Sequence, residues 1–273
     1  MGQRARSLIR LAVLLGTAWE YCVRFVARRV RGPMSPSQRA QWLHESCRAG
    51  LRRLNIDVQV RGSFPDRGLL IANHLSYLDI LVFSSVAPCV FVSKKEVRWW
   101  PVFGQMARMA GTVFIDRSRS ADTLRVNTEM LDALAAGVVV VLFPEGTSSD
   151  GSTLLPFRPA LFDAAVRAQE PVTPAHLRYE VADGSAANDV CYWGSMSFLP
   201  HLMRLLSRRG VRARIHFASQ ARTFADRKSA AQEAHEMVRK LGQLPSLQAR
   251  ATSMPPTELK AHGEESARRG YMR

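Results

Sequence analysis

The sequence predicts an α/β fold: a mainly parallel sheet flanked by helices, with an additional amphipathic helix at the amino terminus. Short apolar segments recur along the 273 residues, and helical stretches separate several of them. Strands that alternate with helices form parallel sheets covered on both faces. One segment, VVVVLF at 138–143, is an unbroken apolar run, which is typical of a central strand buried on both sides.

Each expected strand is a short apolar run between polar or turn-forming residues. The runs are IDVQV (56–60), GLLIA (68–72), CVFVS (89–93), GTVFI (111–115), VVVVLF (138–143), PVTPAHL (171–177) and VRARIHF (211–217). Helical periodicity predicts helices at 38–53, 77–86, 97–109, 120–136, 157–168 and 197–209. Gly137 is well placed just after the end of the helix predicted at 120–136. Ser35 or Ser37 can cap the start of the helix predicted at 38–53.

The charge balance predicts an anionic partner. The chain has 38 basic and 23 acidic residues, a formal net charge of +15, and it is 47% hydrophobic, which is enough for a packed core. Such an excess of positive charge attracts nucleic acid or the headgroups of a membrane. The sequence has no zinc-finger spacing, no RNP-type aromatic strand and no basic zipper. We therefore expect membrane lipids as partners and no nucleic acid.

The cysteines are far apart in the sequence and form no CxxC pair: Cys22, Cys47, Cys89 and Cys191. Structural zinc sites and disulfide frameworks usually have closely spaced cysteines. We expect free or buried thiols in a reducing compartment, and no metal site.

Residues 6–31 are the candidate for membrane association. The uninterrupted apolar part, Leu11–Trp19, is far shorter than the roughly 20 residues that span a bilayer. On a helical wheel, with only Val13 interrupting, the polar residues gather on one side: Arg6, Arg10, Thr17, Glu20, Arg24 and Arg28. We expect a monotopic helix whose arginine side chains reach lipid phosphates. A helix packed on the protein's own domain and a tilted span are the alternatives.

Composition divides the chain into three parts. The stretch GPMSPSQ (32–38) has the Gly, Pro and Ser content of a linker, and the sequence after about Leu247 is polar and interrupted by prolines. We predict a membrane-associated helix and linker at 1–37, an α/β domain at 38–246, and a disordered tail at 247–273.

Polar residues directly follow three of the predicted strands. NHLSYLD (73–79) follows GLLIA, DRSR (116–119) follows GTVFI, and PEGTSSDG (144–151) follows VVVVLF. Ligands of open α/β sheets bind beyond the carboxyl ends of the strands. The three segments are therefore expected to converge on one pocket.

The first of these segments contains a histidine and an aspartate, His74 and Asp79. The residues SYLD fit a helix N-capping box, with Ser76 as N-cap and Asp79 at the third helical position. His74 then lies on non-helical backbone and can fold back, so that Asp79 accepts from one ring nitrogen while the other acts as a base. The alternative is that Asp79 only caps the helix and that His74 is a loop residue.

Together the segments resemble the lysophospholipid (glycerolipid) acyltransferase family, which includes 1-acylglycerol-3-phosphate acyltransferases. The matching blocks, in the family's order, are NHLSYLD (73–79), GTVFIDR (111–117), FPEGTSS (143–149) and PVTPAHL (171–177). The resemblance implies transfer of a fatty acyl group from acyl-CoA or acyl carrier protein to the free hydroxyl of a lyso-lipid. The first choice of acceptor is 1-acylglycerol-3-phosphate, which would give phosphatidic acid.

The implied activity agrees with the residues. An alcohol that attacks a thioester must lose its proton, and a histidine held by a carboxylate can remove it without a metal or a covalent enzyme intermediate. The sequence has no G-x-S-x-G elbow, which argues against a serine hydrolase. We therefore predict His74 as the general base and Asp79 as the residue that orients it. No cofactor is expected besides the acyl donor as co-substrate.

The resemblance also implies substrate-binding residues in and between the blocks: Asn73, Lys95, Arg117, Glu145, Gly146, Thr147, Ser148 and Arg158. One position departs from the pattern, because many lysophosphatidate enzymes have an arginine where this chain has Ser148. Arg158 is expected to take over that arginine's role. Otherwise the acceptor is another lyso-lipid, such as lyso-ornithine lipid.

Two other classes of protein compete with an enzyme. A non-catalytic membrane-binding protein would tolerate loss of His74, and a nucleic-acid binder would bind duplex or single strands in a salt-sensitive way. Esterase and transacylase activities lie closer to the main prediction. The acyl donors occur in the cytoplasm, so we expect a membrane-associated enzyme with a cytoplasm-facing site, at a bacterial inner membrane.

Overall fold

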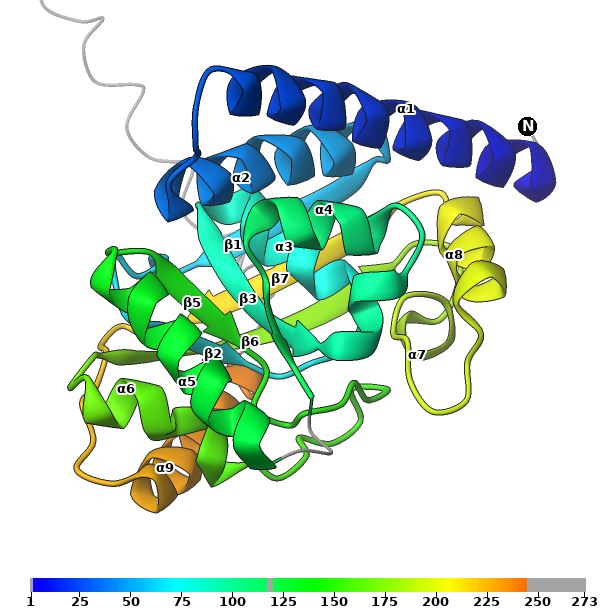
Figure 1. The fold of residues 1–273 in the computed structure, drawn as a ribbon. Helices are drawn as coiled ribbons and strands as arrows, with labels where there is room; N and C mark the ends of the chain where they lie inside the picture. Colours follow the sequence, from blue (N-terminus) through cyan, green and yellow to red (C-terminus); the bar gives the residue numbers. More distant parts are fainter. Residues whose placement is uncertain (1, 117–119, 245–273) are drawn as a thin grey trace, which may run out of the picture. The chain divides into compact units, whose positions relative to one another are not determined.

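The computed structural model describes residues 2–116 and 120–244, and within them a seven-stranded sheet forms the centre of the fold (Figure 1). Its order is β1-β7-β6-β2-β5-β3-β4, and every neighbouring pair is parallel except β6 and β7. The strands are β1 (Ile56–Arg61), β2 (Leu69–Ala72), β3 (Cys89–Lys94), β4 (Val113–Ile115), β5 (Val139–Leu142), β6 (Val172–Val181) and β7 (Val211–Phe217). The predicted α/β fold and all the predicted strands are confirmed.

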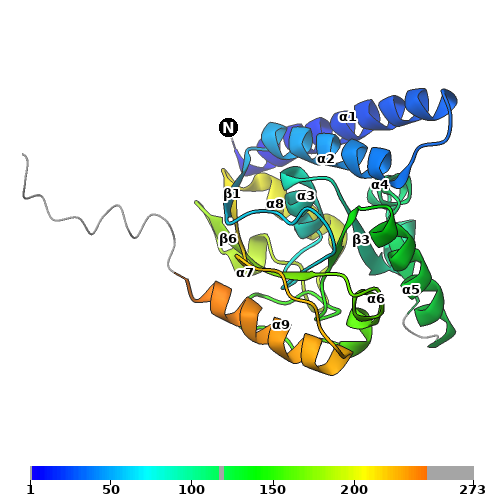
Figure 2. The same cartoon turned by 90° about the vertical axis from the view of Figure 1, so that its left-hand side faces the viewer.

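Helices cover both faces of the sheet (Figures 1 and 2). One core lies between the sheet and α1 (Gln3–Val30), α2 (Pro36–Arg53), α3 (Leu78–Val86), α4 (Phe103–Ala110) and α8 (Phe198–Ser207). The other lies between the sheet and α5 (Ser120–Ala135), α6 (Asp163–Arg167) and α9 (Arg227–Gly242). The short elements are η1 (Lys95–Trp99), η2 (Pro159–Phe162) and α7 (Ala186–Asp189).

Alternate residues of the central strands face the two cores. On β2, Leu70 and Ala72 belong to the core shared with α2 and α3, whereas Leu69 and Ile71 belong to the core shared with α5 and α9. None of these side chains is exposed. An apolar residue is therefore required at every position of β2, as expected for a strand covered on both faces.

Two predicted helix boundaries are confirmed by their capping contacts. Ser35 is the N-cap of α2: its hydroxyl accepts from the backbone N–H of Gln38, and the Gln38 side chain accepts from the N–H of Ser35. Gly137, just after α5, has φ = +70°. This is the left-handed conformation that commonly ends a helix and that glycine adopts without strain.

The helix predicted at 97–109 is wrong in its extent, because the chain forms η1 and α4 with a break between them. Pro101 explains the break. A proline disfavours helical backbone at the residue before it, and Trp100 is extended, with ψ = 132°.

Helix α9 was not among the predicted helices. Its buried face is made largely of alanine: Ala230, Ala231, Ala234 and Val238. The spacing of these residues is helical, but alanine gives a weak apolar signal between the charged residues of 227–242. Only the neighbouring core residues reveal which face is covered.

The prediction that the arginine side chains of the amino-terminal helix reach lipid phosphates is wrong for Arg6 and Arg10. The arginine stripe of this helix contacts the protein instead of pointing away from it. Arg6 donates to the carbonyl of Ser207 at 2.7 Å, and Arg10 donates to the carbonyls of Arg208 and Arg209. The last carbonyls of a helix have no partner within the helix, so the two guanidinium groups supply donors for the end of α8.

The same stripe contacts α2 in the second half of α1. Arg53 of α2 donates to the hydroxyl of Thr17 at 2.9 Å and to the carboxylate of Glu20 at 2.8 Å. Thr17 is buried. The polar face of the helix therefore packs on the protein's own domain, as in the alternative prediction.

The outward face of α1 is apolar. Its exposed large hydrophobic residues are Leu8, Ile9, Leu15, Trp19, Val23, Val26 and Val30, with Trp19 73% and Val30 81% exposed. We call these residues the α1 apolar stripe. No helix among the described residues is long and apolar enough to cross a bilayer. The sequence pattern identified an amphipathic helix with a broad apolar face, and part of that face is exposed. The structure contradicts the expected contact of Arg6 and Arg10 with lipid phosphates.

Two sequence predictions lie outside the described residues: the disordered tail at 247–273 and the role of Arg117.

Candidate active site

The loop after β2 brings His74 and Asp79 together. The ring Nδ1 of His74 lies 2.7 Å from Oδ2 of Asp79, which is the contact predicted from the sequence. A carboxylate oxygen accepts hydrogen bonds, so Nδ1 donates to Asp79, and in the neutral ring Nε2 then carries the lone pair. Asp79 is fully buried, whereas 22% of the His74 side chain is exposed. One nitrogen is therefore held by the protein and the other is available for chemistry.

The local helix start differs from the predicted capping box. Helix α3 begins at Leu78 after Tyr77, and the hydroxyl of Ser76 is buried with no hydrogen-bond partner among the described atoms. Half of the box is present, since Asp79 Oδ2 accepts from the N–H of Ser76 at 3.0 Å and from that of Leu75 at 2.7 Å. Asp79 thus shapes the turn as well as holding the histidine.

The exit of β5 supplies the surface on which the His74 ring rests. The ring stacks on Phe143, with centroids 4.3 Å apart and planes inclined by 10°. The backbone N–H of Ser149 donates to the carbonyl of His74 at 3.0 Å. Because β2 and β5 are neighbours in the sheet, the first and third polar segments meet as predicted.

Glu145 holds the backbone of the same loop through two hydrogen bonds. Its Oε1 accepts from the backbone N–H of His74 at 2.7 Å, and its Oε2 accepts from that of Leu155 at 2.9 Å. The side chain is buried. Burial raises the pKa of Glu145 to about 7, although the two hydrogen bonds act in the opposite direction. Both carboxylate oxygens are used by the protein's own backbone.

Asn73 has a similar structural contact on the other side of β2. Its amide donates to the carbonyl of Leu177 at 2.9 Å and accepts from the N–H of Leu177 at 2.7 Å. The side chain thus extends the pairing of β2 with β6 by one further step. Asn73 is buried, and it positions the residue that follows it, His74.

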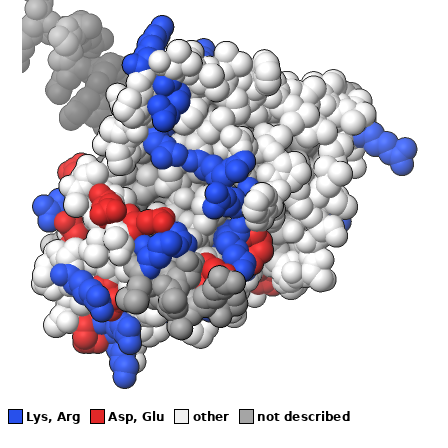
Figure 3. Space-filling view, viewed as in Figure 1, with Lys and Arg blue, Asp and Glu red and all other residues white. Residues whose placement is uncertain are grey.

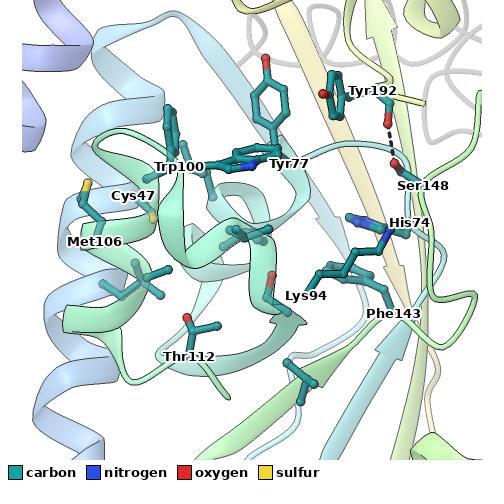
Figure 4. Close-up of a pocket in the computed structure, with 18 of the residues that line it drawn as sticks. Cys47, His74, Tyr77, Lys94, Trp100, Met106, Thr112, Phe143, Ser148 and Tyr192 are labelled. Atoms are coloured by element: carbon teal, nitrogen blue, oxygen red, sulfur yellow. Dashed lines mark hydrogen bonds between the residues drawn. The ribbon is translucent and has the colours of Figure 1, made fainter. Parts of the chain in front are cut away.

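A cavity opens beside His74 and continues between helices (Figure 4). At the His74 end it is lined by Lys94, Gly146, Thr147, Ser148 and Tyr192. Further in, its walls are mainly apolar and come from α1, α2, α3, α4 and η1: Leu14, Ala18, Leu43, Cys47, Gly50, Ile80, Leu81, Val97, Phe103 and Met106. A polar end with a histidine and a long apolar interior suits an amphiphile with a reactive group at its head.

Lys94, and not Lys95, lines the cavity. In Figure 4 the Lys94 side chain points along the cavity toward His74. Lys95 lies outside the lining and forms an ion pair with Asp116, with 2.6 Å between Nζ and Oδ2. The sequence contained both lysines, but only the direction of β3 at its last residue selects between them.

The other predicted substrate-binding residues divide into two groups. Gly146, Thr147 and Ser148 line the cavity, and the Ser148 hydroxyl donates to the carbonyl of Tyr192. Arg158, Asn73 and Glu145 do not line the cavity. The Arg158 side chain is exposed, whereas those of Asn73 and Glu145 are buried. Among the described residues, no group of three or more His, Cys, Asp or Glu side chains could hold a metal ion.

The raised pKa of Glu145 predicts a pH-dependent stability that Glu145→Gln removes. Between pH 4.5 and about 7 the folded protein keeps a proton on Glu145 that the unfolded chain has released. The free energy of unfolding should therefore fall as the pH rises through this window, by roughly 3 kcal/mol at most. Denaturant unfolding of both proteins at pH 5, 6, 7 and 8 measures the difference.

The exposed Glu233→Gln is the control, because it should keep the wild-type pH dependence. An unchanged slope in Glu145→Gln would contradict the assignment of the proton to Glu145.

Comparison with known proteins identifies the family of the chain. The acyltransferase family model matches residues 55–178. The chain is 38% identical over 187 residues to the lyso-ornithine lipid O-acyltransferase of Brucella abortus, covering 63% of this chain and 70% of that protein. It is 35% identical over 221 residues to the 1-acyl-sn-glycerol-3-phosphate acyltransferase of Neisseria meningitidis, covering 80% and 84% of the two chains.

A solved structure shares the fold. The crystal structure of the 1-acyl-sn-glycerophosphate acyltransferase from Thermotoga maritima matches with a TM-score of 0.62 and 21% identity, over 89% of this chain and 99% of that one. The sequence blocks, the His74–Asp79 pair at the end of β2 and the relatives all indicate the same family. The chain belongs to the acyltransferase family.

Proposed function

We propose that this acyltransferase moves a fatty acyl group from acyl-CoA or acyl carrier protein to the free hydroxyl of a lyso-lipid, with His74 as general base. The observation that carries the proposal is the 2.7 Å contact between His74 Nδ1 and Asp79 Oδ2 at the polar end of an apolar cavity. Nε2 takes the proton of the acceptor hydroxyl as its oxygen attacks the thioester carbonyl. The imidazolium, held by Asp79, then returns the proton to the departing thiol.

The apolar interior of the cavity is the proposed place of the acyl chain. It is lined by side chains of α2 and α4, with α1 contributing Leu14 and Ala18. Each methylene that leaves water for such a lining contributes roughly 0.8 kcal/mol. In this proposal, a fully inserted acyl chain has its thioester beside His74.

The acceptor that we propose first is 1-acylglycerol-3-phosphate. Lys94 is the one basic residue among the described lining residues besides His74, and its ammonium group suits a phosphate as a point charge. The runner-up is lyso-ornithine lipid. Ser148 favours it, because an arginine at that position would have held a phosphate in a bidentate way. Relatives carry both names.

The proposed membrane contact uses the α1 apolar stripe. Exposed apolar residues that continue along one helix face can enter the headgroup region of a bilayer, and the net charge of +15 favours anionic lipid. Figure 3 shows Lys and Arg side chains over α4 and beside η1, where the negative groups of the acyl donor could be held. A site facing the cytoplasm of a bacterial cell belongs to the same proposal, because the donors occur there.

His74→Ala tests the mechanism. We expect a loss of acyl transfer of about 100-fold or more, as removal of a general base causes. The assay combines labelled acyl-CoA or acyl carrier protein with lysophosphatidic acid and other lyso-lipids, and mass spectrometry resolves the products. Thermal unfolding checks that the variant is folded.

Equal activity of the two proteins would reject His74 as the base. A wild type that acylates a lyso-aminolipid but ignores saturating lysophosphatidate would replace the first acceptor by the runner-up. No product with any pair would favour a non-catalytic membrane-binding protein.

Gly50→Leu tests the position of the acyl chain. Gly50 lines the cavity, and a Cβ at this position would meet nothing within 4 Å, so the new side chain fills open space. We expect the preferred donor to become shorter by several methylenes, with transfer of the longest chains falling by about tenfold. Competition between donors of different length measures the preference.

The matched control is Gly16→Leu, because a Cβ there also meets open space but Gly16 does not line the cavity. The same chain-length preference in all three proteins would place the acyl chain elsewhere.

Trp19→Glu tests the membrane contact. Trp19 is 73% exposed in the middle of the α1 apolar stripe, so a charge there should abolish sedimentation with vesicles of anionic phospholipid. The melting temperature and the activity on detergent-dispersed acceptor should stay at wild-type levels. Val60→Glu, on the edge strand β1, is the control and should still bind. Wild-type vesicle binding by Trp19→Glu would exclude this face as the contact.

A further inference from the structure

We propose that Tyr179 is a positioning residue that keeps His74 an effective base near neutral pH, by donating its hydroxyl hydrogen bond to Asp79. The inference rests on the proposed function, since it concerns the same proton transfer. Tyr179 belongs to β6, outside every block that carried the sequence resemblance. Its hydroxyl lies 2.7 Å from Oδ1 of Asp79, and both side chains are buried.

The hydrogen bonds of Asp79 are divided between its two oxygens. Oδ2 accepts from the His74 ring and from the N–H groups of Leu75 and Ser76, whereas the partner of Oδ1 among the described residues is the hydroxyl of Tyr179. A fully buried carboxylate oxygen without a partner carries a large desolvation cost. The Tyr179 hydroxyl therefore both fixes the rotation of the carboxylate and stabilises its charge.

Tyr179 acts as a permanent donor. Burial raises its pKa well above the usual value of 10, and the adjacent negative charge of Asp79 raises it further. The hydroxyl thus stays protonated at any pH at which the protein works. By donating to Oδ1 it draws negative charge away from Oδ2, the oxygen that faces the histidine.

The consequence is an effect on proton binding by His74. A carboxylate that lacks one donor holds a neighbouring imidazolium more strongly. Without the Tyr179 hydroxyl, the ring of His74 would keep its proton to a higher pH. The acid limb of the activity profile would then move to higher pH, while activity at high pH would stay almost normal.

Other titratable groups surround the pair. Burial raises the pKa of Cys191 to about 12 and that of Tyr77 further still, so both stay neutral across the working range. Glu145, whose pKa is about 7, contacts the backbone of His74, and the Lys94 side chain points toward the ring (Figure 4). Both are unchanged in a Tyr179 variant, so their contributions are common to the proteins that are compared.

The test compares wild type, Tyr179→Phe and the control Tyr21→Phe, which changes a buried tyrosine of α1. We measure kcat from pH 5.5 to 9.5 and follow the His74 ring by NMR with labelled histidine. In Tyr179→Phe the acid limb of the profile and the ring titration should both move to higher pH by about half a unit or more. Activity above pH 9 should stay within about twofold of wild type.

Two further experiments complete the test. In an Asp79→Asn background, Tyr179→Phe should have no additional effect on the ring titration, as a double-mutant cycle requires. If Tyr179→Phe does not fold, 3-fluorotyrosine at position 179 replaces it, and its stronger donor should move the titration to lower pH. A wild type without acyl transfer would defeat the proposed function, and the NMR titration would still decide this inference.

An activity loss of equal size at every pH, or an unmoved ring titration, would overturn the role of Tyr179.

Discussion

The buried carboxylate of Asp79 is the interaction on which the rest of the site depends. A charge with no access to water must be satisfied by donors, and here the donors come from the loop itself, from the His74 ring and from Tyr179 on β6. The same hydrogen bonds that stabilise the charge also define the turn before α3 and select the histidine tautomer. Removing the carboxylate would therefore disturb the backbone and the base together.

The sheet fixes the position of the turn that follows β2. Asn73 extends the pairing of β2 with β6, and Glu145 ties the His74 backbone to the loop after β5. Because β6, β2 and β5 are adjacent strands, the two side chains anchor the turn from both sides. Both residues were predicted to bind substrate. In the structure, both side chains bind backbone groups of the protein, and they hold the loop that carries His74.

Helix α1 turns its arginine stripe and part of its apolar surface, including Tyr21, toward the protein, and it leaves the α1 apolar stripe exposed. The inward side meets the exposed carbonyls at the end of α8 and the guanidinium of Arg53, which need polar partners. The α1 apolar stripe stays exposed in the described part of the protein. Such a continuous apolar surface is unfavourable in water and suits contact with lipid. The helix also lines the far part of the cavity through Leu14, so the proposed membrane contact and acyl site share one element.

The sequence by itself determined the sheet, because apolar runs such as 138–143 leave a strand no other way to bury its side chains. It also determined the pairing of His74 with Asp79, since the distance between them is set within a single turn. Only the tertiary structure decided which of Lys94 and Lys95 enters the cavity and that Tyr179 completes the carboxylate. These contacts join residues as much as a hundred positions apart, and no local pattern encodes them. The direction of α1 was decided in the same way, because a helical wheel separates two faces but does not say what each face will meet.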